Sequence, residues 1–244
     1  MRVDKVYRSA DQIISVSDTY AERAKSVNIK CDNPITVYLG SERAFFDSAV
    51  QNNIPKYLKP NKEFWIGYCG TLGHSYDLTV VMEAMKMLVE RGIRNLCLMV
   101  IGSGPLEEAF KRQAMELGIS CIFTGKLPYD QMCAQLNQCD IAVNPIAKGA
   151  AQSIINKHAD YAIAGLPVIN TQECEEYRNL LKKYECGINC EAESVEQVAE
   201  AIHFFMENQE IYDLMCKKAR EMGDERFERR KRYTEILHAI ERVL

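Results

Sequence analysis

A regular alternation of apolar strands and amphipathic helices begins at residue 63, and it constrains the fold of this chain more than any other feature. Strands joined through helices run parallel, so the alternation predicts an α/β fold with a doubly wound, Rossmann-like parallel sheet covered by helices on both faces. Ligands of such sheets bind beyond the carboxyl ends of the strands. The apolar runs that predict strands are 64–69, 96–101, 121–124, 140–144, 166–169 and 187–190.

The first 62 residues and the C-terminus follow other patterns. Apolar runs at 11–17 and 35–39 predict two short strands, with a helix from about residue 18 to 26 between them. Residues 40–62 are rich in proline and polar residues, which predicts a linker with at most a short helix near 42–49. We therefore divide the chain into residues 1–62 and 63–244. The second part is expected to end in three helices, over 194–207, 209–222 and 225–244.

Composition excludes several classes of protein. The chain has 244 residues, 47% of them hydrophobic, and a net charge of -4, which fits a globular protein without a nucleic-acid footprint. No apolar run approaches the roughly 20 residues needed to span a bilayer. The ten cysteines include no Cys-x-x-Cys pair, and the four histidines lack ligand spacing. We therefore expect neither a metal site nor a disulfide framework, but reduced thiols in a cytoplasmic protein.

The stretch from Gln152 to Asn170 is the strongest candidate for a binding site. Ser153 is a plausible N-cap of a helix, and Asn156 and Asp160 lie four residues apart on one face, with Lys157 beside them. The free N–H groups and dipole of a helix start favour an anion, Lys157 adds a full charge, and Asp160 can accept hydrogen bonds from sugar hydroxyls. The alternative is that this polar stripe is the solvated face of an amphipathic helix.

Two glycine-containing turns and two basic features also leave alternatives open. Gly70-Thr71-Leu72-Gly73 follows a strand and either cradles phosphate with its amides or is a plain turn, and for 102–105 we favour the plain turn. Neither is a dinucleotide fingerprint or a Walker loop. Lys126 and Leu127 either support a base or lie at the surface. The basic segment 225–232 is either a solvated helix face or a peripheral contact with lipid phosphates.

Taken together, four segments resemble the donor-binding half of retaining glycosyltransferases of the GT-B fold, in the glycosyl transferases group 1 family. The resemblance implies that residues 63–244 bind a nucleotide sugar, a UDP-sugar or GDP-sugar, without a metal or other cofactor. It also implies transfer to a polysaccharide or glycolipid acceptor, in the cytoplasm or at the inner face of the membrane. The segments are 10–17, 66–72, 100–106 with 123–128, and 156–169.

The resemblance also carries over to individual residues. Asp160 matches a family glutamate that grips the nucleotide ribose, and Gln152 falls where a second glutamate, eight residues earlier, lies near the sugar. Lys157 belongs to an Asn-Lys pair that recurs in some branches of the family. The expected catalytic residues are Lys157 and Gln152, and the expected donor-binding residues are Gly70, Thr71, Leu72, Gly73, Lys126, Leu127, Ser153, Asn156, Lys157 and Asp160.

The chain departs from the family in two ways. Many members carry an arginine and a lysine where this chain has Thr71 and Tyr76, and Gln152 replaces a carboxylate. A degenerate module that binds a nucleotide or a partner without turnover is therefore the main alternative, and an oxidoreductase is disfavoured. The family also has an N-terminal acceptor-binding domain, of which residues 1–62 resemble only the end. We expect the acceptor half to be truncated or on another chain, with the helix over 225–244 crossing back to it.

Overall fold

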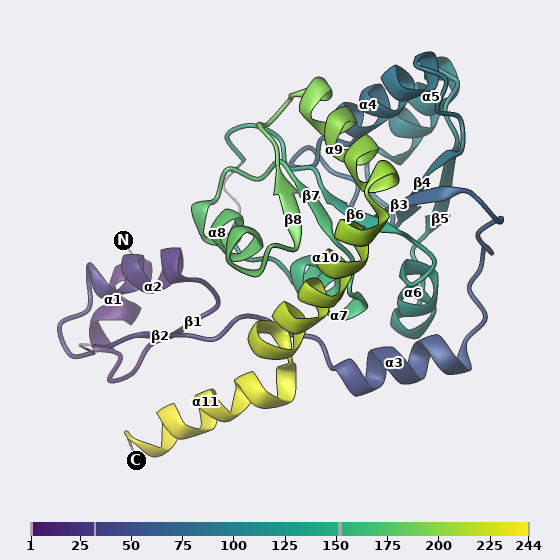
Figure 1. The fold of residues 1–244 in the computed structure, drawn as a ribbon. Coiled ribbons are helices and arrows are strands. Elements are labelled where there is room, and N and C mark those ends of the chain that lie inside the picture. Colours follow the sequence, from purple (N-terminus) through teal and green to yellow (C-terminus); the bar gives the residue numbers. More distant parts are fainter. Residues whose placement is uncertain (1, 32, 151–152, 244) are drawn as a thin grey trace.

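The computed structural model describes residues 2–31, 33–150 and 153–243, and it confirms the doubly wound fold (Figure 1). Its six-stranded parallel sheet has the order β5-β4-β3-β6-β7-β8. Strands are added outward from β3 in one direction and then from β6 in the other, so the order reverses between β3 and β6. The strands are β3 (Phe64–Cys69), β4 (Leu96–Ile101), β5 (Cys121–Gly125), β6 (Ile141–Asn144), β7 (Val168–Asn170) and β8 (Gly187–Asn189).

Burial on both faces explains why the central strands are continuous apolar runs. All six residues of β4 are buried, and β4 pairs in register with β3 over its whole length. In β3, Trp65 packs into one core and Ile66 into the other. One core lies under α4 (Leu78–Glu90), α5 (Glu107–Leu117) and α9 (Val195–Glu207); the other lies under α6 (Tyr129–Leu136), α7 (Asn156–Ala164), α8 (Glu175–Tyr184) and α10 (Gln209–Met222).

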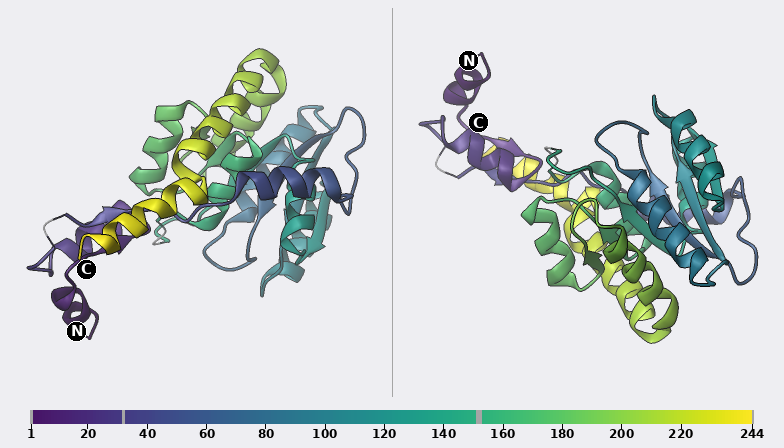
Figure 2. Two further views of the ribbon diagram at one scale, coloured as in Figure 1. Left: turned by 90° about the horizontal axis from the view of Figure 1, so that it is seen from below. Right: turned by 90° about the horizontal axis from the view of Figure 1, so that it is seen from above.

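The N-terminal elements form a small separate sheet. Strands β1 (Ile14–Ser15) and β2 (Ile35–Thr36) pair in parallel, and α1 (Arg2–Ser9) and α2 (Asp18–Lys25) accompany them. Each strand is shorter than its apolar run, because each has a single neighbour and only two paired residues. This small sheet and α11 (Arg229–Glu241) project from the same end of the molecule (Figures 1 and 2).

The segment expected to be a linker contributes to the main core. It contains α3 (Arg43–Asn52), whose Phe46 is fully buried in the same core as α6 and α7. Further along, the backbone N–H of Tyr57 donates to the side-chain amide of Gln135, which donates back to the carbonyl of Tyr57 at 3.1 Å. This segment is therefore packed against α6 and α7, on one face of the sheet, rather than loosely joined to them.

Two chain segments run side by side beneath α7, and we call them the crossing segments: residues 40–41 and 227–229. The N–H of Ser41 donates to the carbonyl of Phe227 at 3.0 Å, and the N–H of Arg229 donates to the carbonyl of Ser41 at 3.1 Å. A β-carbon on Gly40 would lie 2.4 Å from the Phe227 oxygen, so this approach requires glycine.

The last helix begins later than the sequence predicted. Residues 223–227 form a π-helical turn, and Glu228 is extended, which delays the start of α11 to Arg229. Within the described ranges, no helix is both long enough and apolar enough to cross a membrane.

The packing of α3 predicts a contrast between two adjacent phenylalanines. Phe46→Ala should lower the free energy of unfolding by about 3–5 kcal/mol, because it empties a fully buried site. Phe45 is 45% exposed and stacks on Tyr129, so Phe45→Ala should cost about 1 kcal/mol. Urea denaturation of both variants measures the difference. Equal small losses would mean that α3 is not part of the core.

Candidate functional site

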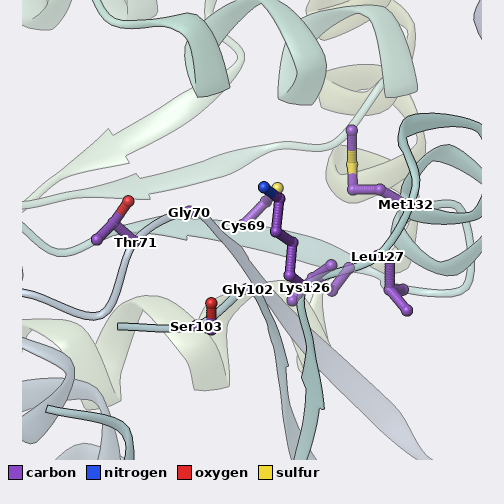
Figure 3. A pocket seen from close by; sticks show the side chains of 9 residues that line it. Cys69, Gly70, Thr71, Gly102, Ser103, Lys126, Leu127 and Met132 are labelled. Carbon is purple, nitrogen blue, oxygen red and sulfur yellow. The ribbon is translucent and has the colours of Figure 1, made fainter. Parts of the chain in front are cut away.

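A cleft lies at the carboxyl edge of the sheet, where the strand order reverses. It consists of three adjoining pockets of about 330, 510 and 590 Å³. The first is lined by the loops that follow β3, β4 and β5 (Figure 3). The second and third extend it to the start of α7 and to the crossing segments. Residues shared by two or more pockets are Leu39, Cys69, Gly70, Thr71, Lys126, Leu127, Met132, Asn156 and Asp160.

Only the first two residues of the predicted phosphate loop 70–73 line the cleft. The N–H groups of Gly70 and Leu72 donate to the carbonyls of Ile101 and Ser103, both at 3.0 Å. These two amides are therefore occupied within the chain. Gly70 and Thr71 line the cleft, whereas the Leu72 side chain is fully buried in a core and Gly73 lies outside the lining.

Glycine is needed where the first two loops touch. Gly102 has φ +143°, and a β-carbon there would lie 1.9 Å from the carbonyl oxygen of Gly70. Gly70 has φ +146°, and a β-carbon there would lie 3.2 Å from Nζ of Lys157. The loop after β3 therefore lies directly against the lysine of α7.

The start of α7 differs from the prediction. The helix begins at Asn156 and not at Ser153, and its N-cap Ile155 has an extended backbone. The Ile155 N–H donates to Nδ1 of His158 at 3.3 Å. Ser153 does not cap the helix because it is buried in the preceding loop, where its carbonyl accepts a hydrogen bond from Nε2 of Gln172 at 2.9 Å. Ser153 and Asn156 both line the cleft.

Gln152, the other expected catalytic residue, lies outside the described residues.

Lys157 is buried in the wall of the cleft. Its side chain is 7% exposed, and among the described residues its ammonium has no hydrogen-bond partner. Nζ lies 4.2 Å from the ring centre of Tyr68 and 3.8 Å from that of Tyr76. Burial lowers the pKa of Lys157 to about 7. The two tyrosine faces offset part of the free-energy cost of burying the charged ammonium. An anion in the cleft would relieve the remaining cost.

Asp160 lines the same cleft from the next turn of α7. Its Oδ1 accepts hydrogen bonds from Oγ of Ser41 at 2.5 Å and from the hydroxyl of Tyr129 at 2.8 Å. Burial raises the pKa of Asp160, and these two bonds act in the opposite direction. Sequence reasoning missed Ser41 and Tyr129, because neither stands in a recognisable motif and Ser41 is 119 residues away from Asp160.

A ladder of asparagine side chains supports the cleft from the other side. Asn144, Asn170 and Asn189 occupy matching positions at the ends of β6, β7 and β8. Nδ2 of Asn144 donates to Asn170, and Nδ2 of Asn170 donates to Asn189, both at 2.8 Å. Asn144 also donates to Gln172, which fixes the carbonyl of Ser153. The sequence did carry a signal, since each of these strands ends in asparagine.

The predicted base-binding residues reach the cleft, and arginines of the basic segment form contacts within the chain. Figure 3 shows the Lys126 side chain extending into the first pocket near Leu127. In the basic segment, Nε and Nη2 of Arg229 donate to the carbonyl of Gly40. Arg230 and Arg232 pair with Glu42 and Glu235. These three arginines therefore serve contacts within the chain.

The cysteines and the possible metal ligands were considered over the described parts of the chain. All ten cysteines are free thiols. Within the described parts of the chain, no group of three or more histidine, cysteine, aspartate or glutamate residues could hold a metal ion.

Comparison with known proteins identifies the fold. A sequence model of the family described as Glycosyl transferases group 1 matches residues 49–222. Comparison with curated protein sequences gives no match. Sucrose-phosphate synthase from Thermosynechococcus elongatus superposes with a TM-score of 0.76 at 16% identity, over 99% of this chain and 60% of that one.

Two further solved structures are similar. HepE from Anabaena in complex with UDP-glucose gives a TM-score of 0.77 at 13% identity, over 98% of this chain and 66% of that one. A mutant of TarM from S. aureus in complex with fondaparinux, alpha-GlcNAc-glycerol and UDP gives 0.75 at 12%, over 98% of this chain and 45% of that one. The predicted fold, a doubly wound parallel sheet like that of GT-B glycosyltransferases, is confirmed, and the chain spans 60% of the length of the sucrose-phosphate synthase structure.

The buried ammonium of Lys157 is expected to lower the free energy of unfolding of the protein. Lys157→Met should raise the free energy of unfolding by about 1–2 kcal/mol at pH 7, because it removes a buried charge that has no hydrogen-bonded partner among the described residues. The folded pKa of about 7 lies below the ordinary 10.5, so the gain should shrink as the pH rises from 7 towards 10.5. Urea denaturation at several pH values measures it.

The exposed Lys126 provides the matched control for this substitution. Lys126→Met should leave the free energy of unfolding nearly unchanged. A Lys157→Met protein that is less stable than wild type at pH 7 would contradict the expectation.

Proposed function

The chain belongs to the glycosyl transferases group 1 family, and from this premise we propose that it is the nucleotide-sugar-binding part of a retaining glycosyltransferase. The observation that carries the proposal is the placement of Lys157 and Asp160 in one cleft at the start of α7. The donor is a UDP-sugar or a GDP-sugar. The structures of HepE with UDP-glucose and of a TarM mutant with UDP support the uridine nucleotide.

The start of α7 suits the diphosphate of the donor. Helix N–H groups and the positive end of the helix dipole favour an anion, and the Lys157 ammonium supplies a full charge beside them. In a buried site these groups stabilise the departing nucleotide diphosphate more strongly than they would in water. Transfer would therefore proceed without a metal ion.

Other predicted residues that line the cleft take up positions around this diphosphate. Asp160 accepts hydrogen bonds from the ribose hydroxyls, and Lys126 and Leu127 support the base. Thr71 lies beside the diphosphate. Gln152 keeps the role that the family resemblance implies for it, next to the sugar.

The acceptor is a polysaccharide or a glycolipid, and the location is cytoplasmic, at the inner face of the membrane when the acceptor is lipid-linked. The complete active site requires an acceptor-binding half, on the same protein or on another chain. Residues 1–244 alone would then transfer sugar weakly or not at all.

A degenerate module that binds a nucleotide or a partner without turnover is the second candidate. Thr71 and Tyr76 favour it, because many family members carry an arginine and a lysine at these places, and the Tyr76 ring covers Lys157 instead. Supplying the acceptor-binding half separates the two candidates. Donor hydrolysis or sugar transfer would support the enzyme, and binding without turnover would support the module.

Nucleotide binding is the direct test of the site. UDP or GDP at about 100 times its dissociation constant should stabilise the wild-type protein by roughly 2.7 kcal/mol, seen as a rise in melting temperature. Lys157→Ala and Asp160→Ala should each lose most of this rise, because they remove the cation and the hydroxyl acceptor. Lys148→Ala, a substitution outside the cleft, is the control. If millimolar nucleotide leaves the wild-type melting temperature unchanged, the site is wrongly assigned.

Binding should also take up a proton. The free protein holds Lys157 with a pKa of about 7, and a diphosphate beside the ammonium should raise this pKa. Cys69, Tyr68 and Tyr76 stay protonated, since burial raises the pKa of each. Affinity for UDP should therefore be greatest near pH 7 and fall between pH 7.5 and 9. Calorimetry in buffers of different ionisation enthalpy measures the uptake, which Lys157→Met should abolish.

A further inference from the structure

We infer that Ser41 and Tyr129 are positioning residues that orient the Asp160 carboxylate for the ribose hydroxyls of the donor nucleotide. The inference rests on the proposed function and adds two residues to its site. It also means that the ribose site is completed by the first crossing segment, which lies outside the six-stranded sheet.

Three polar groups form a closed triangle at the wall of the cleft. Oγ of Ser41 and the hydroxyl of Tyr129 both lie within hydrogen-bond distance of Oδ1 of Asp160, at 2.5 and 2.8 Å, and lie 3.1 Å from each other. Ser41 is 4% exposed and Asp160 is 9% exposed. A buried carboxylate held by two donors on one oxygen cannot rotate freely, so its orientation is fixed.

Both donors are themselves held in place. The N–H and carbonyl of Ser41 bond to the second crossing segment, and the Arg229 guanidinium donates to the neighbouring Gly40 carbonyl at 2.9 and 2.7 Å. The Tyr129 ring stacks on Phe45 with centroids 5.5 Å apart. The triangle is therefore rigid on two sides.

The choice of oxygen decides what Asp160 can bind. Oδ1 receives both protein donors, and within the described residues no hydrogen bond to Oδ2 is formed. Ser41, Tyr129 and Asp160 all line the third pocket, and Oδ2 is not a buried atom, so a ligand in this pocket can donate to it. A vicinal diol, such as the 2′ and 3′ hydroxyls of a ribose, has the donors that this oxygen lacks.

The test compares two nucleotides, UDP and 2′,3′-dideoxy-UDP, by titration calorimetry. Wild-type protein should bind UDP about tenfold more tightly, because only UDP offers the diol. Ser41→Ala and Tyr129→Phe should each weaken UDP binding by roughly three- to tenfold and leave the affinity for the dideoxy nucleotide unchanged. Ser41→Thr keeps a hydroxyl and should retain much of the preference. The exposed Ser48→Ala, on α3, is the control.

The outcomes are distinguishable. If Ser41→Ala and Tyr129→Phe weaken both nucleotides equally, their role is general stability and the inference is overturned. Wild-type protein that binds the two nucleotides equally overturns it as well. Binding of neither nucleotide by wild-type protein removes the proposed function, and the inference with it. Tyr129→Phe deletes one oxygen from a partly exposed side chain, so a folded variant is expected even if Ser41→Ala does not fold.

Discussion

The burial of the Lys157 ammonium is the constraint on which the rest of the cleft depends. A buried charge without a hydrogen-bonded partner costs several kcal/mol, and it persists only where the surrounding fold holds it. Two features provide this support. The rings of Tyr68 on β3 and Tyr76 in the following loop cover the ammonium, and Gly70 lets that loop approach the lysine without a side chain between them. Gly102 is required in turn, because it lets the loop after β4 close against Gly70. The packing of these two loops therefore holds the Lys157 cation in its buried position, where an anion in the cleft can interact with it.

The start of α7 is held from two opposite directions. On one side, the amide ladder at the ends of β6, β7 and β8 passes through Gln172 to the carbonyl of Ser153, and so fixes the loop that leads into the helix. On the other side, Asp160 is tied to Ser41 in the crossing segments. The N-terminus of α7 is therefore already held in place before a ligand binds. In physical terms it is preorganised, and binding there loses little conformational entropy. The same geometry links the cleft to the position of α11, since Arg229 begins that helix and also bonds to the residue before Ser41.

The sequence was sufficient for the sheet and insufficient for the contacts that shape the site. Strands buried on both faces produce apolar runs such as Leu96–Ile101, and the predicted helices over 194–207 and 209–222 match α9 and α10 closely. The start of α7 was misplaced, because the carbonyl of Ser153 is bonded by a side chain 19 residues further on. Leu72 was expected at the donor but lies in the core, since pairing between two loops turns it inward. Local pattern cannot show such tertiary pairs, and the same limit hid Ser41 and the role of α3.

The position of the positive charge bears on whether the cleft can act on a donor at all. Thr71 and Tyr76 stand where many family members carry an arginine and a lysine, so this loop lacks two cations. Lys157 provides one cation from α7, where the rings of Tyr68 and Tyr76 cover it. Two unit charges 4 Å apart attract by about 1 kcal/mol in water and by about 4 kcal/mol at the effective dielectric of a partly buried site. One buried cation can therefore stabilise a diphosphate as strongly as several exposed ones. Since Lys157 is also fixed by its helix, it has little entropy to lose when the anion arrives. Under the proposed function, Lys157 supplies the positive charge that Thr71 and Tyr76 do not, so these two loop residues alone are no argument against turnover.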